Sequence, residues 1–208
     1  MKKLVLVGIG LFGMICSSFA QEKESEKSKW SYTLQPRLGL AKYEQSGLVT
    51  LNGTFNAFDV FLTRKIAKNL DLTSGVMFST FDANYTLAGE SARLQNDYVQ
   101  IPLLLGGRIS FDEKSDQNLI SMRVSAGPVA SFLARQENQT TAVKAKDENL
   151  GWNFGILTQL TVDFRISNRS AVYFGLQGQS DFTRIEDNGS ENKIQQASSI
   201  LFGYRGTF

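Results

Sequence analysis

The C-terminal segment Ile200–Phe208 constrains the fold of this chain more than any other stretch. One face of an extended strand would carry Phe202, Tyr204, Gly206 and Phe208, and the other would carry Leu201, Gly203, Arg205 and Thr207. The termini of soluble domains are usually polar and loosely held, whereas this one is an aromatic residue. An apolar outer face, a mostly small or polar inner face and aromatic ends are typical of a strand in a membrane barrel. The segment therefore predicts a barrel strand that closes the sheet.

The N-terminal residues predict an export signal. Lys2 and Lys3 precede the apolar run Leu4–Ile15, and small residues lead to Ala20. This pattern indicates a secretory signal peptide over residues 1–20, cleaved after Ala20. The alternatives are a membrane anchor, for which the run falls short of about 20 residues, and a lipoprotein signal at Cys16, which the large Ile15 disfavours.

The domain plan follows from where the periodicity begins. Residues 21–29 are charged and aperiodic, so we expect a flexible periplasmic lead-in there. Residues 30–208 are expected to form one outer-membrane β-barrel domain.

Charge and cysteine content exclude two classes of protein. The chain has 22 basic and 20 acidic residues. Two of the lysines lie in the predicted signal peptide, so the mature chain has no net charge. Nothing in this balance favours nucleic-acid binding. The single cysteine also lies in the signal, so no disulfide framework is expected in the mature chain.

Eight segments with a period of two predict the strands of the barrel. They lie at about Ser31–Lys42, Thr54–Ile66, Leu70–Asp82, Asp97–Phe111, Leu119–Ala134, Trp152–Ile166, Ala171–Thr183 and from Ala197 to the C-terminus. Each segment is long enough to cross a bilayer, which takes about 9–11 residues of tilted strand.

The connections between these segments alternate in length. Short or moderate ones at 67–69, 112–118 and 167–169 are interleaved with longer polar loops at 44–53, 83–96, 135–151 and 184–196. Outer-membrane barrels have short periplasmic turns and longer external loops. The sequence therefore predicts an all-β fold, an eight-stranded antiparallel up-and-down transmembrane β-barrel.

One strand carries a family resemblance. The segment Asp97–Leu105 (DYVQIPLLL) resembles the Tyr-x-x-Ile-Pro-Leu-Leu strand of the outer membrane β-barrel domain (porin-like) family of diderm bacteria. The glycine-containing segments Ser125–Pro128 and Asn153–Gly155 are similar to strands of that family. The resemblance covers about Trp30 to Phe208, and it implies an eight-stranded outer-membrane barrel but little about activity.

The inner faces of the predicted strands collect charged residues. The candidates are Arg37, Asp59, Arg108, Arg123, Asp163, Arg165, Asp181 and Arg205. Such a set could be a selectivity lining or a binding site. The lumen of an eight-stranded barrel is only wide enough for side chains, and buried charges there must pair. We therefore expect a structural network of ion pairs and hydrogen bonds, and no wide diffusion pore.

Two further features bear on local structure. Pro102 cannot donate a ladder hydrogen bond, so a bulge or kink is expected there, with a ligand-access notch as the alternative. Aromatic residues near the predicted strand ends fit interfacial girdles. They are Trp30, Tyr32, Phe111, Trp152, Phe182 and Phe208.

The chain contains no histidine, which disfavours enzymes that depend on a histidine base. Zinc chemistry is disfavoured for the same reason, so no metal and no cofactor are expected. The acidic pairs Asp147-Glu148 and Glu186-Asp187 could attract a divalent cation, but exposed acidic pairs are usually only solvated.

These observations predict a non-enzymatic integral outer-membrane protein with a structural role or a binding or adhesion role of its loops. The alternative is a small channel or an accessory subunit of a transport or secretion machine. The expected partners are outer-membrane lipid, the barrel-assembly machinery and an unidentified extracellular or periplasmic ligand. Phe202, Tyr204 and Phe208 are the predicted assembly signal. A soluble lipocalin-like barrel is disfavoured, because such a barrel would place its large apolar residues inside.

Overall fold

The computed structural model describes residues 29–45, 50–87, 89–111, 119–140, 144–187 and 190–208. The predicted signal peptide and nearly all of the predicted lead-in lie outside these ranges. Within them, no helix is long and apolar enough to span a membrane.

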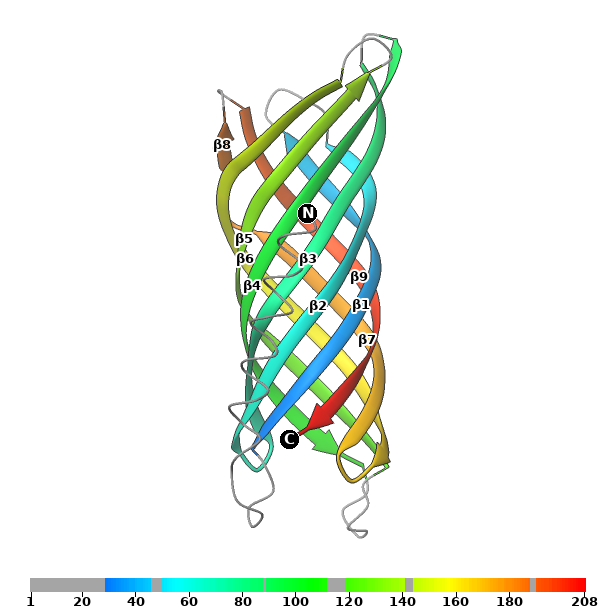
Figure 1. The fold of residues 1–208 in the computed structure, drawn as a ribbon, viewed down its shortest axis with the longest axis vertical. Helices are drawn as coiled ribbons and strands as arrows, with labels where there is room; N and C mark the ends of the chain where they lie inside the picture. The colour runs from blue at the N-terminus through cyan, green and yellow to red at the C-terminus, as the bar shows by residue number, and fades with distance from the viewer. Residues whose placement is uncertain (1–28, 46–49, 88, 112–118, 141–143, 188–189) are drawn as a thin grey trace.

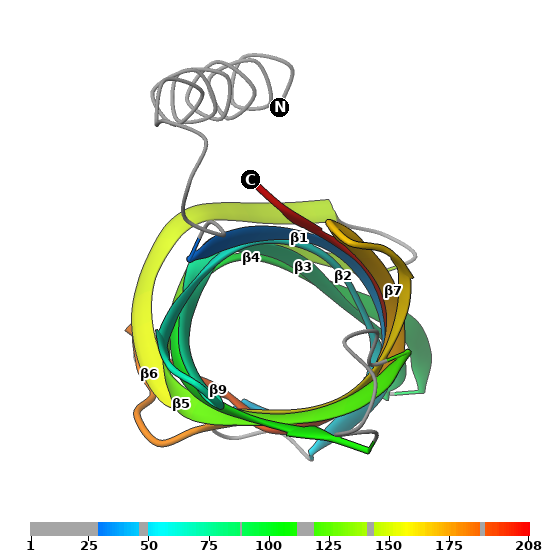
Figure 2. The same cartoon turned by 90° about the horizontal axis from the view of Figure 1, so that it is seen from below.

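The described chain folds into a closed antiparallel sheet (Figures 1 and 2). Its strands are β1 (Trp30–Gln45), β2 (Leu51–Ala67), β3 (Leu70–Leu87), β4 (Glu90–Ser110), β5 (Ile120–Thr140), β6 (Lys144–Ser167), β7 (Ser170–Asp181), β8 (Ile185–Asp187) and β9 (Ser190–Thr207). Each long strand pairs with its neighbour in sequence, and β1 also pairs with β9. The short β8 pairs with β9 beyond the end of β7, so the ring itself is closed by the eight long strands. The predicted eight-stranded up-and-down transmembrane barrel is confirmed.

The seam between β1 and β9 closes the barrel. Leu34 faces Tyr204 across it, and the main-chain nitrogen of Phe208 donates a 3.3 Å hydrogen bond to the carbonyl of Trp30. The ring of Tyr32 lies 5.5 Å from that of Phe208 and 6.1 Å from that of Tyr204. The C-terminal segment is thus the closing strand that its alternation predicts.

The two ends of the barrel differ. β1 begins and β9 ends at one end, which we call the proximal end, and the short turns at 68–69 and 168–169 lie there too (Figure 1). We call the opposite end the distal end; there β3 turns into β4 and β5 turns toward β6.

The distal connections correct the sequence prediction. Residues 83–96 and 135–151 were expected to be loops, but β3 and β4 continue to Leu87 and from Glu90, and β5 and β6 continue to Thr140 and from Lys144. Residues 184–196 likewise contain β8 and the start of β9. These segments resemble loops in sequence because their outward-facing residues are polar. Their backbone nevertheless remains paired as in the rest of the sheet.

Pro102 does not produce the expected bulge. The register between β4 and β5 is the same on both sides of it, from Pro102 opposite Val129 to Leu105 opposite Ala126. The irregularity between these strands lies instead at Asp97 and Tyr98. Beside Pro102, the backbones approach closely at Gly127, where an added Cβ would lie 2.0 Å from the Leu103 carbonyl oxygen. Only glycine fits this position, and the sheet absorbs the missing donor without losing register.

Candidate functional site

A belt of exposed apolar side chains surrounds the proximal part of the barrel. On β4 and just beyond it, Ile101, Leu103, Leu105, Ile109 and Phe111 are all exposed outward. Strands rise about 3.3 Å per residue and tilt by roughly 45°, so this segment spans roughly 23 Å along the barrel axis. The outward apolar band of a membrane barrel is about 25 Å tall. The belt therefore has the height of a bilayer's hydrocarbon core.

The strands continue well beyond this belt at the distal end. β4 and β5 each have 21 residues, and β6 has 24, whereas crossing a bilayer takes about 9–11. The remaining half of β4 extends the wall by roughly 20 Å at the same rise and tilt. The barrel is thus a membrane segment continued by a second segment outside it.

The polarity of the wall reverses between the two segments. In the distal part of β2, Asn52, Thr54 and Asn56 are exposed outward, while Phe55 is completely buried inside. Within the belt the same strand presents Phe58 outward and buries Asp59. The distal segment therefore has the apolar interior of a water-soluble barrel.

Buried apolar residues fill the distal segment, and we call them the outer core. They are Ala41, Tyr43, Leu51, Phe55, Phe81, Ala83, Leu94, Tyr98, Leu133, Ile185, Ile194 and Ala197. The rings of Tyr43 and Phe81 stack with centroids 5.2 Å apart. Sequence reasoning missed this core. In the sequence, this core is marked by large apolar residues at the inward-facing positions, which hold charged residues closer to the proximal end.

A layer of large side chains also crosses the lumen within the belt. Phe61, Met77, Leu104, Val129 and Leu157 form it, and each is at most 2% exposed. These residues come from five of the eight ring strands. The lumen is therefore filled with side chains at this level, as expected for a ring of eight strands.

Next to this layer lies a buried polar network centred on Arg37 and Asp59. The Arg37 Nε and Nη2 atoms donate to the two carboxylate oxygens of Asp59 at 2.7 and 3.1 Å. The Gln35 amide donates a third hydrogen bond to Asp59 at 2.7 Å. The Gln35 carbonyl oxygen accepts from Gln159 at 3.0 Å and from the Tyr173 hydroxyl at 2.9 Å. The charges of this pair are thus both neutralised and hydrogen-bonded.

A second group of charges lies nearer the proximal end. Arg123 pairs with Asp71 at 2.6 Å, and Arg205 pairs with Asp163. The Arg205 guanidinium also lies 4.8 Å from the centroid of the Tyr173 ring. Sequence reasoning did not single out Asp71, although it occupies an inward position just after a short turn.

The remaining three inner candidates differ in their surroundings. Arg108 donates a 3.1 Å hydrogen bond to the Ser121 hydroxyl, and Arg165 lies within electrostatic reach of it. Asp181 stands apart from both groups near the distal edge of the belt. It accepts hydrogen bonds from the Asn153 amide at 2.8 Å and the main-chain nitrogen of Ile194 at 3.0 Å. It forms no ion pair with a described residue.

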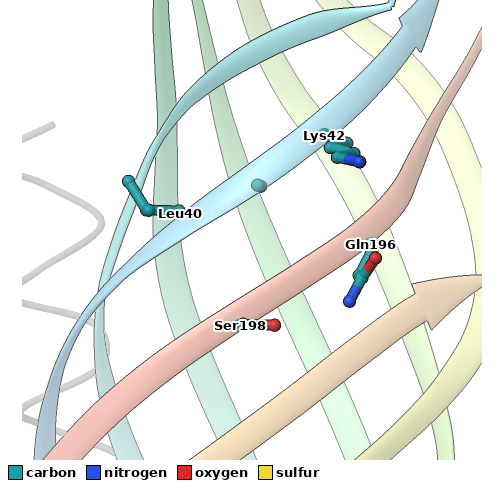
Figure 3. Close-up of a pocket in the computed structure, with 5 residues that line it drawn as sticks. Leu40, Lys42, Gln196 and Ser198 are labelled. Atoms are coloured by element: carbon teal, nitrogen blue, oxygen red, sulfur yellow. The ribbon is translucent and has the colours of Figure 1, made fainter.

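An outer pocket of about 280 Å³ marks the distal edge of the belt at the seam (Figure 3). Leu40 and Lys42 of β1 and Gln196 and Ser198 of β9 line it on the outer surface. The change from an apolar to a charged side chain within two residues places the Lys42 ammonium group at the level of lipid headgroups. The β1–β9 register also shifts at this point, between Lys42 and Tyr43.

The acidic pairs Asp147-Glu148 and Glu186-Asp187 are the candidates for a cation site. The described residues contain no group of three or more acidic, cysteine or histidine side chains that could hold a metal ion. Glu148 of the first acidic pair instead pairs with Lys146.

No protein-family model matches the sequence, and no curated protein matches it either. The solved structures that are similar in fold include the following three. Neisserial surface protein A is 14% identical with a TM-score of 0.48, covering 85% of this chain and 97% of its own. The Pseudomonas aeruginosa outer membrane protein OprG is 9% identical, with a TM-score of 0.43 and coverages of 88% and 99%. The attachment invasion locus protein Ail of Yersinia pestis is 7% identical, with a TM-score of 0.39 and coverages of 85% and 99%.

These TM-scores lie below 0.5, so the fold assignment depends on the strand pairing of this chain itself. That pairing gives the architecture of an outer-membrane β-barrel. Membership of the porin-like family stays a prediction, because no family model matches.

Proposed function

We propose that this protein is a non-enzymatic integral protein of the bacterial outer membrane whose distal end is a binding or adhesion surface. The reversal of wall polarity carries the proposal. A barrel that only crossed the membrane would need no apolar core beyond the belt. Here the outer core holds the paired strands rigid for roughly 20 Å outside the bilayer, which places the strand ends where a partner can reach them.

Ion pairs between neighbouring strands stiffen the rim of this distal segment. The Arg184 guanidinium lies 2.9 Å from Glu44 of β1 and also pairs with Glu191 of β9. Lys193 approaches the second Glu44 oxygen at 3.3 Å. These contacts add side-chain links to the backbone pairing of β1 with β9, which continues to Gln45 opposite Asn192. A pre-organised rim loses less conformational entropy when a partner binds.

The inner charges have a structural role in this proposal. A wide pore is poorly supported, because an apolar layer and the Arg37–Asp59 network fill the lumen within the belt. The partners we propose are outer-membrane lipid around the belt, the barrel-assembly machinery, and a ligand at the distal rim. The proximal end, with the chain entering β1 and leaving β9, would face the periplasm.

The test measures the conductance of the purified full chain and the adhesion of cells that display it. In planar bilayers we expect no steps, and large regular steps would favour the channel alternative. Cells that display the protein should adhere to at least one member of a panel of immobilised extracellular proteins and polysaccharides. Reversing charge at the distal rim with Lys144→Glu and Lys146→Glu should alter that adhesion, whereas Lys68→Glu at the proximal end should not. Adhesion equal to that of cells without the protein would contradict the proposal.

A further inference from the structure

The proximal mouth of the barrel contains a pocket of about 140 Å³ with a strongly basic lining. Six of its lining residues are cationic: Lys29, Lys65, Lys68, Arg108, Arg123 and Arg205. Among the described residues, Asp71 is the only acidic one that lines it. This mouth is seen end-on in Figure 2, where the ring is viewed from below. The volume corresponds to about four or five water molecules, which is enough for a compact polyatomic ion.

The acidic side chains near this mouth neutralise only part of its charge. Arg123 is paired with Asp71, and Arg205 is paired with Asp163. Among the described residues, no carboxylate lies within ion-pair distance of Lys65, Lys68 or Arg108. Several like charges thus converge beside a wall that is surrounded by lipid. Such a cluster is unfavourable unless an anion joins it.

Arg123 is the most deeply buried of the cations that line this pocket. Its side chain is more than nine-tenths buried, with 8% of the residue exposed. Its Nε atom has no hydrogen-bond partner among the described residues, and neither has the Oδ1 atom of Asp71 beside it. Buried guanidinium donors are nearly always satisfied. The Nε atom is itself closed to solvent, so an anion in the pocket would stabilise Arg123 by balancing the positive charge of the surrounding guanidinium and ammonium groups.

Guanidinium and ammonium groups together favour a tetrahedral oxyanion. Arginine donates two parallel hydrogen bonds to phosphate, while lysine supplies a mobile point charge. We propose that the proximal mouth is a binding site for a phosphate-type oxyanion, held by Arg108 and Arg123 from inside and by Lys65 and Lys68 at the rim. The anion is either free in solution or the phosphate of a lipid headgroup at the adjacent membrane surface. The site is independent of what the distal end binds.

The test uses the folded full chain and distinguishes the two sources. Binding of inorganic phosphate to protein in detergent micelles is followed by ³¹P NMR line broadening. Retention of phosphatidylglycerol against phosphatidylcholine is followed by native mass spectrometry of protein released from mixed nanodiscs. The variants are Arg108→Gln and the rim double variant Lys65→Gln with Lys68→Gln. Arg93→Gln, on the exposed outer surface of the distal segment, is the matched control for loss of one positive charge.

We expect saturable binding in at least one arm, weakened about tenfold or more in both site variants and unchanged in the control. Phosphate binding identifies a free anion, and selective retention of phosphatidylglycerol alone identifies a lipid headgroup. The proposal is overturned if neither probe binds, or if Arg93→Gln weakens binding as much as the site variants do. Lys65 near the end of β2 and Lys68 in the turn after it are both exposed. Their replacement should therefore leave the fold intact, and the double variant tests the site even if Arg108→Gln fails to fold.

Discussion

Removing the carboxylate of Asp59 should destabilise the barrel far more than removing an exposed one. Arg37 is 1% exposed and Asp59 is fully buried, and two hydrogen bonds join them. Asp59→Ala would leave the Arg37 charge buried without a partner and would also remove the hydrogen bond from Gln35. Two unit charges about 4 Å apart interact by about 4 kcal/mol at an effective dielectric constant of about 20. Breaking a buried ion pair typically lowers the free energy of unfolding by about 3–5 kcal/mol, and we expect Asp59→Ala to lower it by an amount in that range.

The measurement is urea unfolding of the barrel in vesicles, followed by tryptophan fluorescence and by the mobility of unheated samples in gels. The exposed pair of Arg93 and Asp82 provides the control, because these side chains are 49% and 25% exposed. Asp82→Ala should lower the free energy of unfolding by at most about 1 kcal/mol. The double replacement Arg37→Leu with Asp59→Leu should recover much of the loss, since it removes both buried charges together.

An Asp59→Ala variant as stable as Asp82→Ala would refute this reasoning. Arg37 would then have to be solvated, which requires water inside the belt. The same result would weaken the argument that the lumen is closed, and conductance measurements on that variant would show whether an aqueous path exists.

Three further outcomes follow from other parts of the molecule. Phe81→Ala should lower the free energy of unfolding by about 3–5 kcal/mol and make the distal strands accessible to protease, while membrane insertion stays normal. Protection from protease equal to that of the wild type would mean that the outer core is not packed. Hydrogen bonds from Lys144 and then Arg135 lower the pKa of Glu137, so its contribution to the β5–β6 hairpin is present at neutral pH and lost as pH falls through that lowered pKa. A spin label at Ala145→Cys should therefore gain mobility as the pH is lowered from neutral to below the ordinary range of a glutamate carboxyl. In Glu137→Gln the label should be mobile at both ends of this titration, and an unchanged pH response there would exclude Glu137 as the cause. Deleting Phe208 should reduce the yield of membrane-inserted protein more than the stability of barrels already formed, and a normal yield would count against the assembly-signal role.

The belt could be predicted from the sequence because one rule governs it. From Ile101 to Phe111, every second residue meets lipid and the others meet a crowded polar lumen, so alternation alone gives the strand and its faces. The inward position of Arg37 and Asp59 followed in the same way. Their pairing did not follow, because it depends on the register that sets Gln35, rather than Arg37, opposite Asp59.

The distal segment escaped prediction because the environment changes while the backbone does not. Beyond the belt, Arg93 and Gln95 meet water on the outside and Leu94 meets an apolar interior. The alternation persists there, but its meaning is inverted. If apolar residues are sought on one constant face of each strand, these residues are assigned to a loop. The bulge between Leu133 and Arg135 adds a change of phase that no local pattern reveals.

The polar exterior of the distal segment also sets a kinetic problem for the newly made protein. If the proximal end stays on the side from which the chain inserts, everything distal to the belt must pass through the hydrocarbon layer first. Polar side chains such as Asn52, Arg93 and Lys146 would have to cross about 25 Å of lipid. The activation barrier to spontaneous insertion should therefore rise steeply with acyl-chain length. A catalyst that thins or opens the bilayer should accelerate this barrel more than one whose strands end at the membrane surface.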